Sequence, residues 1–236
     1  MVKKKGTLVL VRHGESRFNT LNLFTGNIDV SLSSAGLKEA QRVGRHCKKF
    51  DYDVVFTSHL ERAQETLLVI IAPQKKIGIF HHEISARHNT YLNLSERLKT
   101  EVLSVYVSSD LNERSYGILQ GMNKTSANRT YGAGKVLAWR RSYKKCPPKG
   151  ESLKDVYERV ISYFERHIYP RMKRGETILV VAHGNTLRAL VKYLEHISDE
   201  NISSVDLPFA QPLVYTHDDD TFVRTEGLYT LERPLR

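Results

Sequence analysis

The chain has 236 residues, 40% of them hydrophobic and 26% charged, and a formal net charge of +10. This composition excludes an intrinsically disordered chain, and the length suits one large α/β domain, residues 1–236, better than two small ones. The longest apolar run, residues 67–72, is far too short to cross a bilayer, so no membrane partner is expected. The positive charge favours an anionic partner, either nucleic acid or small phosphorylated metabolites, and charge alone does not choose between them.

The amino-terminal segment and the cysteines indicate the compartment. A short apolar run follows the lysines at positions 3–5, but it ends at Arg12, too early for a secretory signal, and no small-residue cleavage site follows. We therefore expect a cytoplasmic protein. Cys47 and Cys146 are the only cysteines, and in a domain of this size we expect both to be reduced. Neither has the spacing of a zinc ligand, so no metal site is predicted.

The first half of the chain alternates buried strands with helices. Residues 7–11 are a continuous run of leucine and β-branched side chains, with no polar residue after Thr7. This run predicts a strand buried on both faces. Residues 53–58 predict a second buried strand, and residues 60–72 predict the helix after it. Between the two strands, Ser33 or Ser34 is expected to cap a helix whose apolar positions keep helical spacing at Leu37, Ala40, Val43 and Cys47.

The second half continues this alternation after an irregular stretch. Within residues 73–101 the pattern predicts a strand at 77–80 and one short helix in otherwise polar sequence. The breaker KKCPPKGE separates two helical patterns. The further elements expected are a strand at 102–107, helices at 131–143 and 152–168, a buried strand at 177–183, a helix at 186–196 and an edge hairpin from residue 212 onward.

Strands that alternate with helices predict the fold class: α/β, with three layers and a mainly parallel central sheet covered by helices on both faces. In such sheets the ligand site lies beyond the carboxyl ends of the strands. His13 and His183 each come directly after a buried strand, and each is followed by glycine. If these two strands are neighbours, both imidazoles face one crevice.

The residues around His13 distinguish it from an ordinary structural histidine. Arg12 adjoins it, Ser16 and Asn19 follow, and the glycine lets the backbone approach a ligand. The positive charge of an adjacent arginine lowers the pKa of an imidazole, which keeps it neutral and nucleophilic. Five other histidines lack such neighbours and are interpreted as structural or surface residues: His81, His82, His88, His167 and His217.

Several charged residues occur where the chain is expected to return to the same edge of the sheet. Arg62 follows the second strand, and Glu113 follows the strand at 102–107, where a carboxylate can serve as general acid or base. Lys124 and the pair Arg140 and Arg141 lie in polar surroundings. Each cation is either a solvated surface charge or a ligand for phosphate oxygens, and the residues alone leave both alternatives open.

An ordered set of motifs resembles a known family. The segments LVRHGES, FTG, FTSHLERA, LNERSYGILQGMNK, WRRSY and VVAHGNTLRALVKYL follow one another between residue 8 and about residue 215. In this order they resemble the cofactor-dependent phosphoglycerate mutases of the histidine phosphatase superfamily. The Arg-His-Gly signature alone indicates the superfamily, whereas LNERSYGILQG, WRR and HGNTLRALVKYL are similar to its mutase branch.

The resemblance implies a role for each matching residue. His13 would accept the phosphoryl group, His183 would stabilise it during transfer, and Glu113 would shuttle the proton of the substrate hydroxyl. Arg12 and Arg62 would hold the phosphoryl oxygens. The further substrate-binding residues implied are Ser16, Asn19, Thr25, Gly26, Tyr116, Lys124, Arg140, Arg141, Gly184 and Asn185. The resemblance also implies 2,3-bisphosphoglycerate as the phosphoryl primer, small phosphoglycerates as substrates and no metal, since no acidic cluster with metal-binding character is found.

The sequence departs from the mutase pattern in three places. Residues 73–101 form a longer link than usual and are interpreted as an insertion, and the chain omits a long loop between Pro148 and Gly150. The tail after residue 231 lacks the lysine- and alanine-rich extension of relatives. We therefore expect weaker oligomerisation than in longer relatives, with a homodimer as one state that the sequence leaves open.

The same departures keep a histidine phosphatase, in which water replaces the acceptor hydroxyl, as the alternative function. A nucleic-acid-binding protein is the distant alternative, because the chain has no stacked-aromatic motif and no recognition-helix signature. We therefore expect no nucleic-acid partner.

Overall fold

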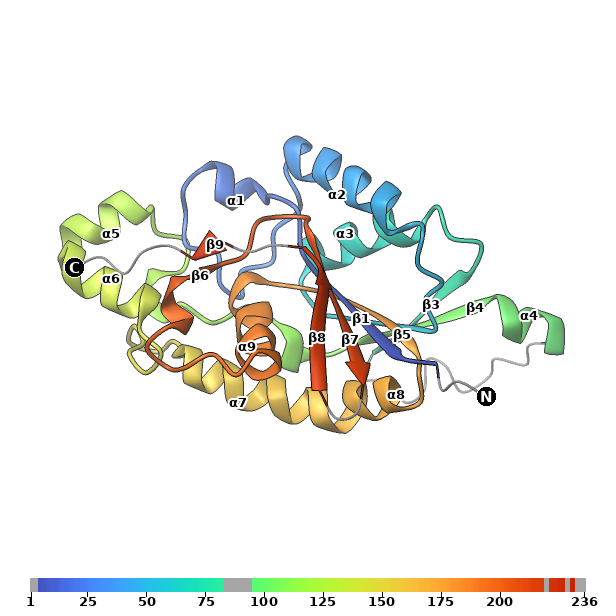
Figure 1. Ribbon diagram of the computed structural model, residues 1–236. Coiled ribbons are helices and arrows are strands. Elements are labelled where there is room, and N and C mark those ends of the chain that lie inside the picture. The colour runs from blue at the N-terminus through green and yellow to red at the C-terminus, as the bar shows by residue number, and fades with distance from the viewer. Residues whose placement is uncertain (1–3, 83–94, 219–220, 228–229, 232–236) are drawn as a thin grey trace.

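A computed structural model describes the chain except for residues 1–3, 83–94, 219–220, 228–229 and 232–236. Its centre is a seven-stranded sheet with the order β3-β4-β2-β5-β1-β7-β8 (Figure 1). The strands are β1 (Gly6–Arg12), β2 (Val54–Thr57), β3 (Ile77–His82), β4 (Val102–Val107), β5 (Thr177–Ala182), β7 (Pro212–Asp218) and β8 (Thr221–Glu226). The first five are parallel to one another, whereas β7 and β8 are antiparallel to their neighbours. The predicted mainly parallel sheet is confirmed.

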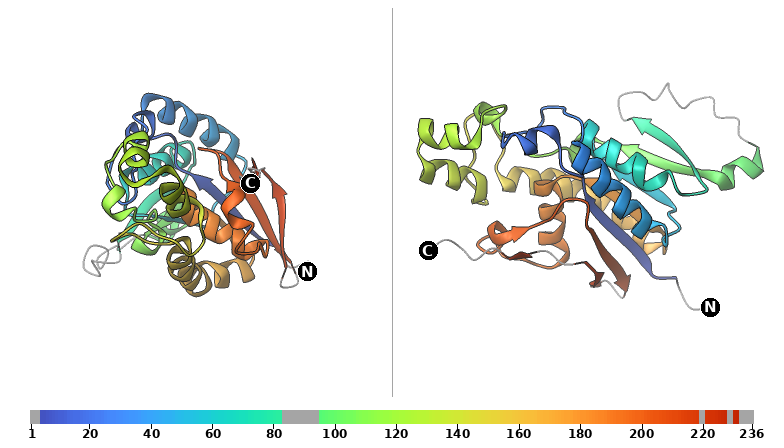
Figure 2. Two further views of the ribbon diagram at one scale, coloured as in Figure 1. Left: turned by 90° about the vertical axis from the view of Figure 1, so that its left-hand side faces the viewer. Right: turned by 90° about the horizontal axis from the view of Figure 1, so that it is seen from above.

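Helices cover both faces of the sheet (Figure 2). On one face lie α2 (Ser34–Cys47) and α3 (Glu61–Ile71), and on the other lie α7 (Leu153–Tyr163), α8 (Tyr169–Lys173) and α9 (Gly184–Leu194). Alternate side chains of β1 enter the two cores: Leu8 and Leu10 pack toward α7–α9, whereas Val9 and Val11 pack toward α2 and α3. This double burial explains why the strand is apolar at successive positions instead of alternating with polar residues.

The helix predicted over residues 131–143 is present as α6 (Ala133–Arg141). A second short helix directly before it, α5 (Lys124–Tyr131), was not predicted. Gly132 separates them with φ of 87°, a left-handed conformation that ends a helix and that glycine adopts without strain. Asn123 caps α5 through hydrogen bonds to the next backbone amides. The two helices pack over Phe24 and Leu119 and form a third apolar cluster.

The other expected elements are present with shifted ends. Ser33 caps α2 by accepting a hydrogen bond from the Gly36 amide, as expected. The helix predicted at 152–168 continues from α7 through a π-helical turn, residues 164–168, into α8. The strand at 77–80 and the short helix of the insertion are β3 and α4 (Glu96–Glu101); the rest of that stretch, residues 83–94, lies outside the described residues. The edge hairpin is formed by β7 and β8.

Smaller elements complete the described part of the fold. They are α1 (Arg17–Thr20), the 3₁₀ turns at Ser109–Leu111, Gly117–Leu119 and Ile202–Ser204, and a two-stranded sheet of β6 (Val205–Asp206) with β9 (Thr230–Leu231). Both cysteines are free, Cys47 buried and Cys146 exposed. In the described part of the chain, every helix is too short or too polar to span a bilayer.

Candidate active site

The register of β1 and β5 brings the two His-Gly sequences together. Arg12 pairs with Ala182, so the residues that follow, His13 and His183, lie side by side beyond the carboxyl ends of the strands. Their ring centroids are 5.0 Å apart. A side chain at Gly14 would meet the backbone oxygen of Gly36 at 2.4 Å, so the close approach of α2 requires glycine there.

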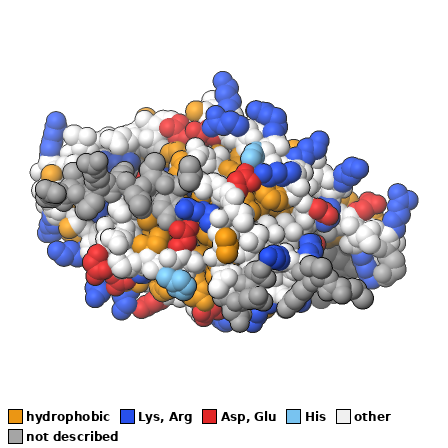
Figure 3. All heavy atoms as spheres, viewed as in Figure 1, with side chains coloured by type: hydrophobic (Ala, Val, Ile, Leu, Met, Phe, Trp, Pro, Cys, Tyr) orange, Lys and Arg blue, Asp and Glu red, His pale blue; other side chains and the backbone are white. Residues whose placement is uncertain are grey.

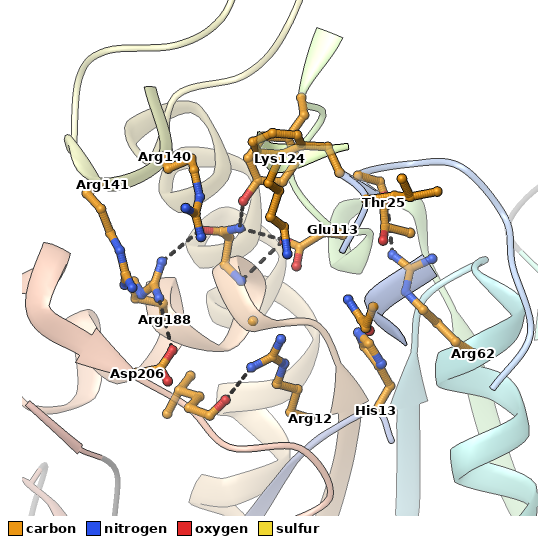
Figure 4. A pocket seen from close by; sticks show the side chains of 18 residues that line it. Arg12, His13, Thr25, Arg62, Glu113, Lys124, Arg140, Arg141, Arg188 and Asp206 are labelled. Atoms are coloured by element: carbon orange, nitrogen blue, oxygen red, sulfur yellow. Dashed lines mark hydrogen bonds and ion pairs between the residues drawn. The ribbon is translucent and has the colours of Figure 1, made fainter. Parts of the chain in front are cut away.

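A strongly basic pocket opens at this edge of the sheet (Figure 4). Of the described residues that line it, six are lysine or arginine and two are carboxylates, so the pocket suits an anion. Arg140, Arg141 and Arg188 lie together on one side of it, whereas His13 and Arg62 lie on the other. The lining residues are Arg12, His13, Asn19, Leu23, Phe24, Thr25, Gly26, Arg62, Glu113, Tyr116, Lys124, Arg140, Arg141, Gly184, Asn185, Arg188, Asp206 and Leu207.

Most of the predicted site residues therefore surround one pocket. Ser16 and His183 are the predicted residues that are not among those lining it. Ser16 is fully buried and caps α1, where its hydroxyl and amide both bond to Asn19. Ser16 thus orients Asn19, which does line the pocket.

The surroundings of His13 select one tautomer. Its Nδ1 lies 2.6 Å from the carbonyl oxygen of Gly14. A carbonyl oxygen only accepts, so Nδ1 carries the proton and Nε2 keeps the lone pair. Burial, together with the charges of Arg62 and Arg12, lowers the pKa of His13 well below its usual 6.5. The ring is therefore neutral at neutral pH, with a nucleophilic Nε2.

His183 is equally buried and neutral. Burial lowers its pKa well below 6.5, and the charge of Arg62 adds to the effect. Its Nε2 is 2.7 Å from the hydroxyl of Ser58, which itself accepts the Leu60 amide at 3.2 Å. The other ring nitrogen, Nδ1, is buried without a hydrogen-bond partner among the described residues.

Arg62 connects α3 to the loop that carries Thr25 and Gly26. It is 1% exposed, and its two terminal nitrogens donate to the carbonyl oxygens of Ile28 at 3.0 Å and Gly26 at 2.8 Å. Burial lowers the pKa of Arg62 to about 10, so the guanidinium remains charged at neutral pH. The arginine thus fixes the loop and places a buried positive charge beside His13.

Glu113 is held in place by three donors on one carboxylate oxygen. Oε1 accepts from the amide of Arg114 at 2.7 Å, from the amide of Asn185 at 3.2 Å and from Nδ2 of Asn185 at 3.0 Å. Nδ2 of Asn185 also lies 3.3 Å from the hydroxyl of Tyr116. Burial acts to raise the pKa of that hydroxyl, but the charge and hydrogen bond of Arg114, together with the hydrogen bond from Asn185, outweigh it and the pKa is lowered. A carboxylate fixed in this way can exchange a proton with a ligand in the pocket.

Sequence reasoning missed Arg188 and Asp206. Arg188 on α9 donates to Oδ1 of Asn185 at 2.9 Å and to the Val205 carbonyl at 2.8 Å, and it lies 4.0 Å from Asp206. By holding Oδ1, Arg188 directs Nδ2 of Asn185 toward Glu113. The available signal was helical spacing, because residues three apart on a helix share a face. Asp206 lies in a short segment without periodicity and had no such signal.

The buried polar atoms without partners show what the pocket can hold. Arg12 and Thr25 both line the pocket. The buried Nε of Arg12 and Oγ1 of Thr25 have no hydrogen-bond partner among the described residues. Such buried groups are rare unless a ligand satisfies them. Together with Nδ1 of His183 they suit the oxygens of a phosphoryl group. Among the described residues, no group of three or more His, Cys, Asp or Glu is arranged to hold a metal ion.

Relatives with similar sequences are mutases. Residues 8–85 and 84–226 match the model of the histidine phosphatase superfamily (branch 1). The 2,3-bisphosphoglycerate-dependent phosphoglycerate mutase of Methanococcus vannielii is 42% identical over 215 residues, which cover 90% of this chain and 91% of the relative. The enzyme of the same description from Methanosarcina acetivorans is 40% identical, with 92% and 94% covered.

Solved structures with the same fold are more distant in sequence. A mycobacterial glucosyl-3-phosphoglycerate phosphatase complexed with VO3 has a TM-score of 0.72 at 21% identity, and 96% of this chain and 99% of that chain are covered. The α-ribazole phosphatase of Shigella flexneri has a TM-score of 0.71 at 21% identity, with 96% of each chain covered. At this identity the likeness shows the fold alone. Because of the sequence matches to the family model and to the two mutases, the chain belongs to the histidine phosphatase superfamily, and within it to the family of the 2,3-bisphosphoglycerate-dependent phosphoglycerate mutases.

Proposed function

We propose that this protein is a 2,3-bisphosphoglycerate-dependent phosphoglycerate mutase, which interconverts 3-phosphoglycerate and 2-phosphoglycerate through a phosphohistidine at His13. The observation that carries the proposal is the distribution of charge in the pocket. A neutral histidine with a free Nε2 lies beside Arg12 and Arg62, while Arg140 and Arg141 lie on the opposite side. A substrate with an anionic group at each end fits this arrangement.

His13 is the nucleophile in this mechanism. Its Nε2 attacks phosphorus as the P–O bond breaks and a P–N bond forms, and Arg12 and Arg62 neutralise the phosphoryl oxygens. If Ser58 donates its proton to Nε2 of His183, the neutral ring carries its own proton on Nδ1, which becomes a further donor to those oxygens. These groups act mainly by position and charge, which is what phosphoryl transfer requires.

Glu113 moves the proton. It donates a proton to the substrate oxygen that leaves phosphorus, and it removes the proton of the substrate hydroxyl that attacks phospho-His13 in the reverse direction. Bound 2,3-bisphosphoglycerate would supply the phosphoryl group that primes His13. Lys124, Arg140 and Arg141 would hold the carboxylate and the second phosphate.

The basic charge of the chain is consistent with anionic metabolites as partners. On the face seen in Figure 3, Lys and Arg side chains are spread around the rim with Asp and Glu between them. The cations of the pocket, in contrast, converge on one cavity. The convergence of these cations on one cavity is what favours small phosphoglycerates as partners.

A coupled assay tests the mutase proposal. Formation of 2-phosphoglycerate from 3-phosphoglycerate is measured with and without a catalytic amount of 2,3-bisphosphoglycerate, and inorganic phosphate is measured in parallel. We expect isomerisation that depends on the primer, because His13 must first be phosphorylated, and much slower release of phosphate. Phosphate release that outpaces isomerisation in both conditions would instead identify a histidine phosphatase.

Turnover is expected to be independent of divalent metal, because arginine and histidine side chains supply the positive charge beside the nucleophile. The primed enzyme is incubated with a chelator, passed through a desalting column and assayed for mutase activity. The rate should match that of untreated enzyme. A large loss that magnesium or manganese restores contradicts this expectation.

A further inference from the structure

A segment remote in sequence holds Arg12 at the wall of the pocket. We call residues 205–210 the strap, because they run from β6 to β7 across the end of β1. Nη1 of Arg12 donates to the carbonyl oxygen of Leu207 at 2.5 Å, although 195 positions separate the two residues. The amide of Ala210 donates to the carbonyl oxygen of Arg12 at 2.9 Å. The strap therefore holds both the side chain and the backbone of Arg12.

The aromatic ring of the strap contacts Arg12 and the nucleophile at once. Cζ of Arg12 lies 3.8 Å from the ring centroid of Phe209, and the ring of His13 is 5.7 Å from it, centroid to centroid. Phe209 is partly buried and is not among the residues that line the pocket. It thus supports both side chains from behind without occupying the space of a ligand.

When an aromatic ring contacts the face of a guanidinium, the N–H donors in the guanidinium plane remain unused. In Arg12, Nη1 is satisfied by Leu207, whereas the buried Nε has no hydrogen-bond partner among the described residues. The contact with the ring of Phe209 therefore restrains the guanidinium while Nε stays available to an anion. This is the arrangement that an arginine needs in order to hold a phosphoryl oxygen with a fixed direction.

The backbone of the strap keeps Phe209 in place through an uncommon conformation. Ala210 has φ of 45°, in the left-handed region that residues other than glycine rarely adopt. This turn reverses the chain so that Pro212 pairs with Val11 at the start of β7. Backbone strain of this kind persists where the surroundings determine it, often near functional sites.

We propose that Phe209 is a positioning residue for phosphoryl transfer, whose ring holds the Arg12 guanidinium and the His13 imidazole in the mutual orientation that the transferring group requires. The inference rests on the proposed function, since it assigns Phe209 a part in the phosphorylation of His13. It concerns the end of the pocket at His13 and leaves the cations on the opposite side unaffected.

Replacement of the ring tests this proposal. Phe209→Leu keeps an apolar side chain but removes the stacking face, and we expect phosphorylation of His13 by 2,3-bisphosphoglycerate to slow about tenfold, the range of a partly desolvated cation–π contact. The same loss should appear in the affinity for inorganic vanadate, a mimic of the transferring phosphoryl group. KM for 3-phosphoglycerate should change little while kcat falls, because Arg140 and Arg141 are intact. Phe209→Tyr keeps the ring and should restore both values.

A matched substitution separates positioning from packing. Phe222→Leu makes the same change in the β7–β8 hairpin, where Phe222 packs on Tyr169 and Phe164, so it should lower Tm without slowing phosphorylation. If Phe209→Leu fails to fold, Phe209→Met provides the same measurement, because methionine adapts to irregular space. Wild-type rates and vanadate affinity in the folded variant overturn the inference. Wild-type protein that is not phosphorylated and does not bind vanadate contradicts the proposed function itself.

Discussion

His13→Ala is expected to abolish both phosphorylation of the protein and mutase turnover. Removal of a catalytic nucleophile typically lowers kcat by roughly 10⁴-fold or more. The reason here is specific: Nδ1 of His13 is committed to the Gly14 carbonyl, and burial beside two arginines keeps the ring neutral, so Nε2 is the nucleophile of the site. His183, although its ring centroid is 5.0 Å away, bonds to Ser58 through one nitrogen and cannot take the same position.

The measurement is incorporation of phosphate from labelled 2,3-bisphosphoglycerate, followed by acid treatment, since a phosphohistidine is labile to acid. His167→Ala serves as the control, because it removes an exposed histidine that does not line the pocket. Labelling retained in His13→Ala would assign the phosphoryl group to another residue.

The pH dependence of the wild-type enzyme provides a further test. The acid limb of kcat/KM should lie below pH 6.5, because the lowered pKa values of His13 and His183 keep both rings neutral at that pH.

The double substitution Arg140→Ala with Arg141→Ala should separate a mutase from a phosphatase. Both arginines lie in the last turn of α6 and line the pocket opposite His13. Loss of one charge-assisted contact in such a site costs about 1.5–3 kcal/mol, so KM for 3-phosphoglycerate should rise roughly 100-fold or more in the double variant. An intermediate that is held at one end only should escape or allow water to reach phospho-His13. We therefore expect the ratio of hydrolysis to isomerisation to rise.

The outcome distinguishes pocket residues from surface charges. Arg129→Ala is the control, because Arg129 is an exposed cation of the adjacent helix α5 and does not line the pocket. A solvated charge contributes little, so Arg129→Ala should be nearly silent. An unchanged mutase rate and KM in the double variant would show that Arg140 and Arg141 are solvated surface charges as well.

The strands and the location of the pocket were predictable because they depend on local patterns. Apolar runs identified β1, β2 and β5, and the rule that ligands lie beyond the carboxyl ends of parallel strands placed His13 and His183 at one edge. Helix ends were less predictable where a glycine or a backbone contact decides them. Gly132 ends α5 and sets the start of α6 within the predicted range 131–143, and α9 starts at Gly184, before its apolar periodicity becomes visible.

The parts of the site that could not be predicted are those assembled by distant segments. Leu207 and Phe209 meet Arg12 only because β7 pairs with β1, and no periodicity marks residues 205–210. Arg188 acts on Glu113 through Asn185, a relation that requires the orientation of an amide side chain. The resemblance to mutases named most of the residues that line the pocket, whereas those that hold them in place required coordinates.

The position of β1 in the sheet has a consequence for synthesis of the protein. Of the described strands β1 is synthesised first, yet both of its partners, β5 and β7, lie beyond residue 176. Its fully buried residues Leu8, Val9, Leu10 and Val11 therefore have no neighbouring strand until residue 182 has emerged, and their second neighbour is complete only at residue 218. Contacts of such large sequence separation slow folding and leave apolar segments exposed to aggregation. The segment that carries His13 is synthesised early but reaches its position in the sheet late. Nascent chains that stop short of β7 are therefore expected to need chaperones.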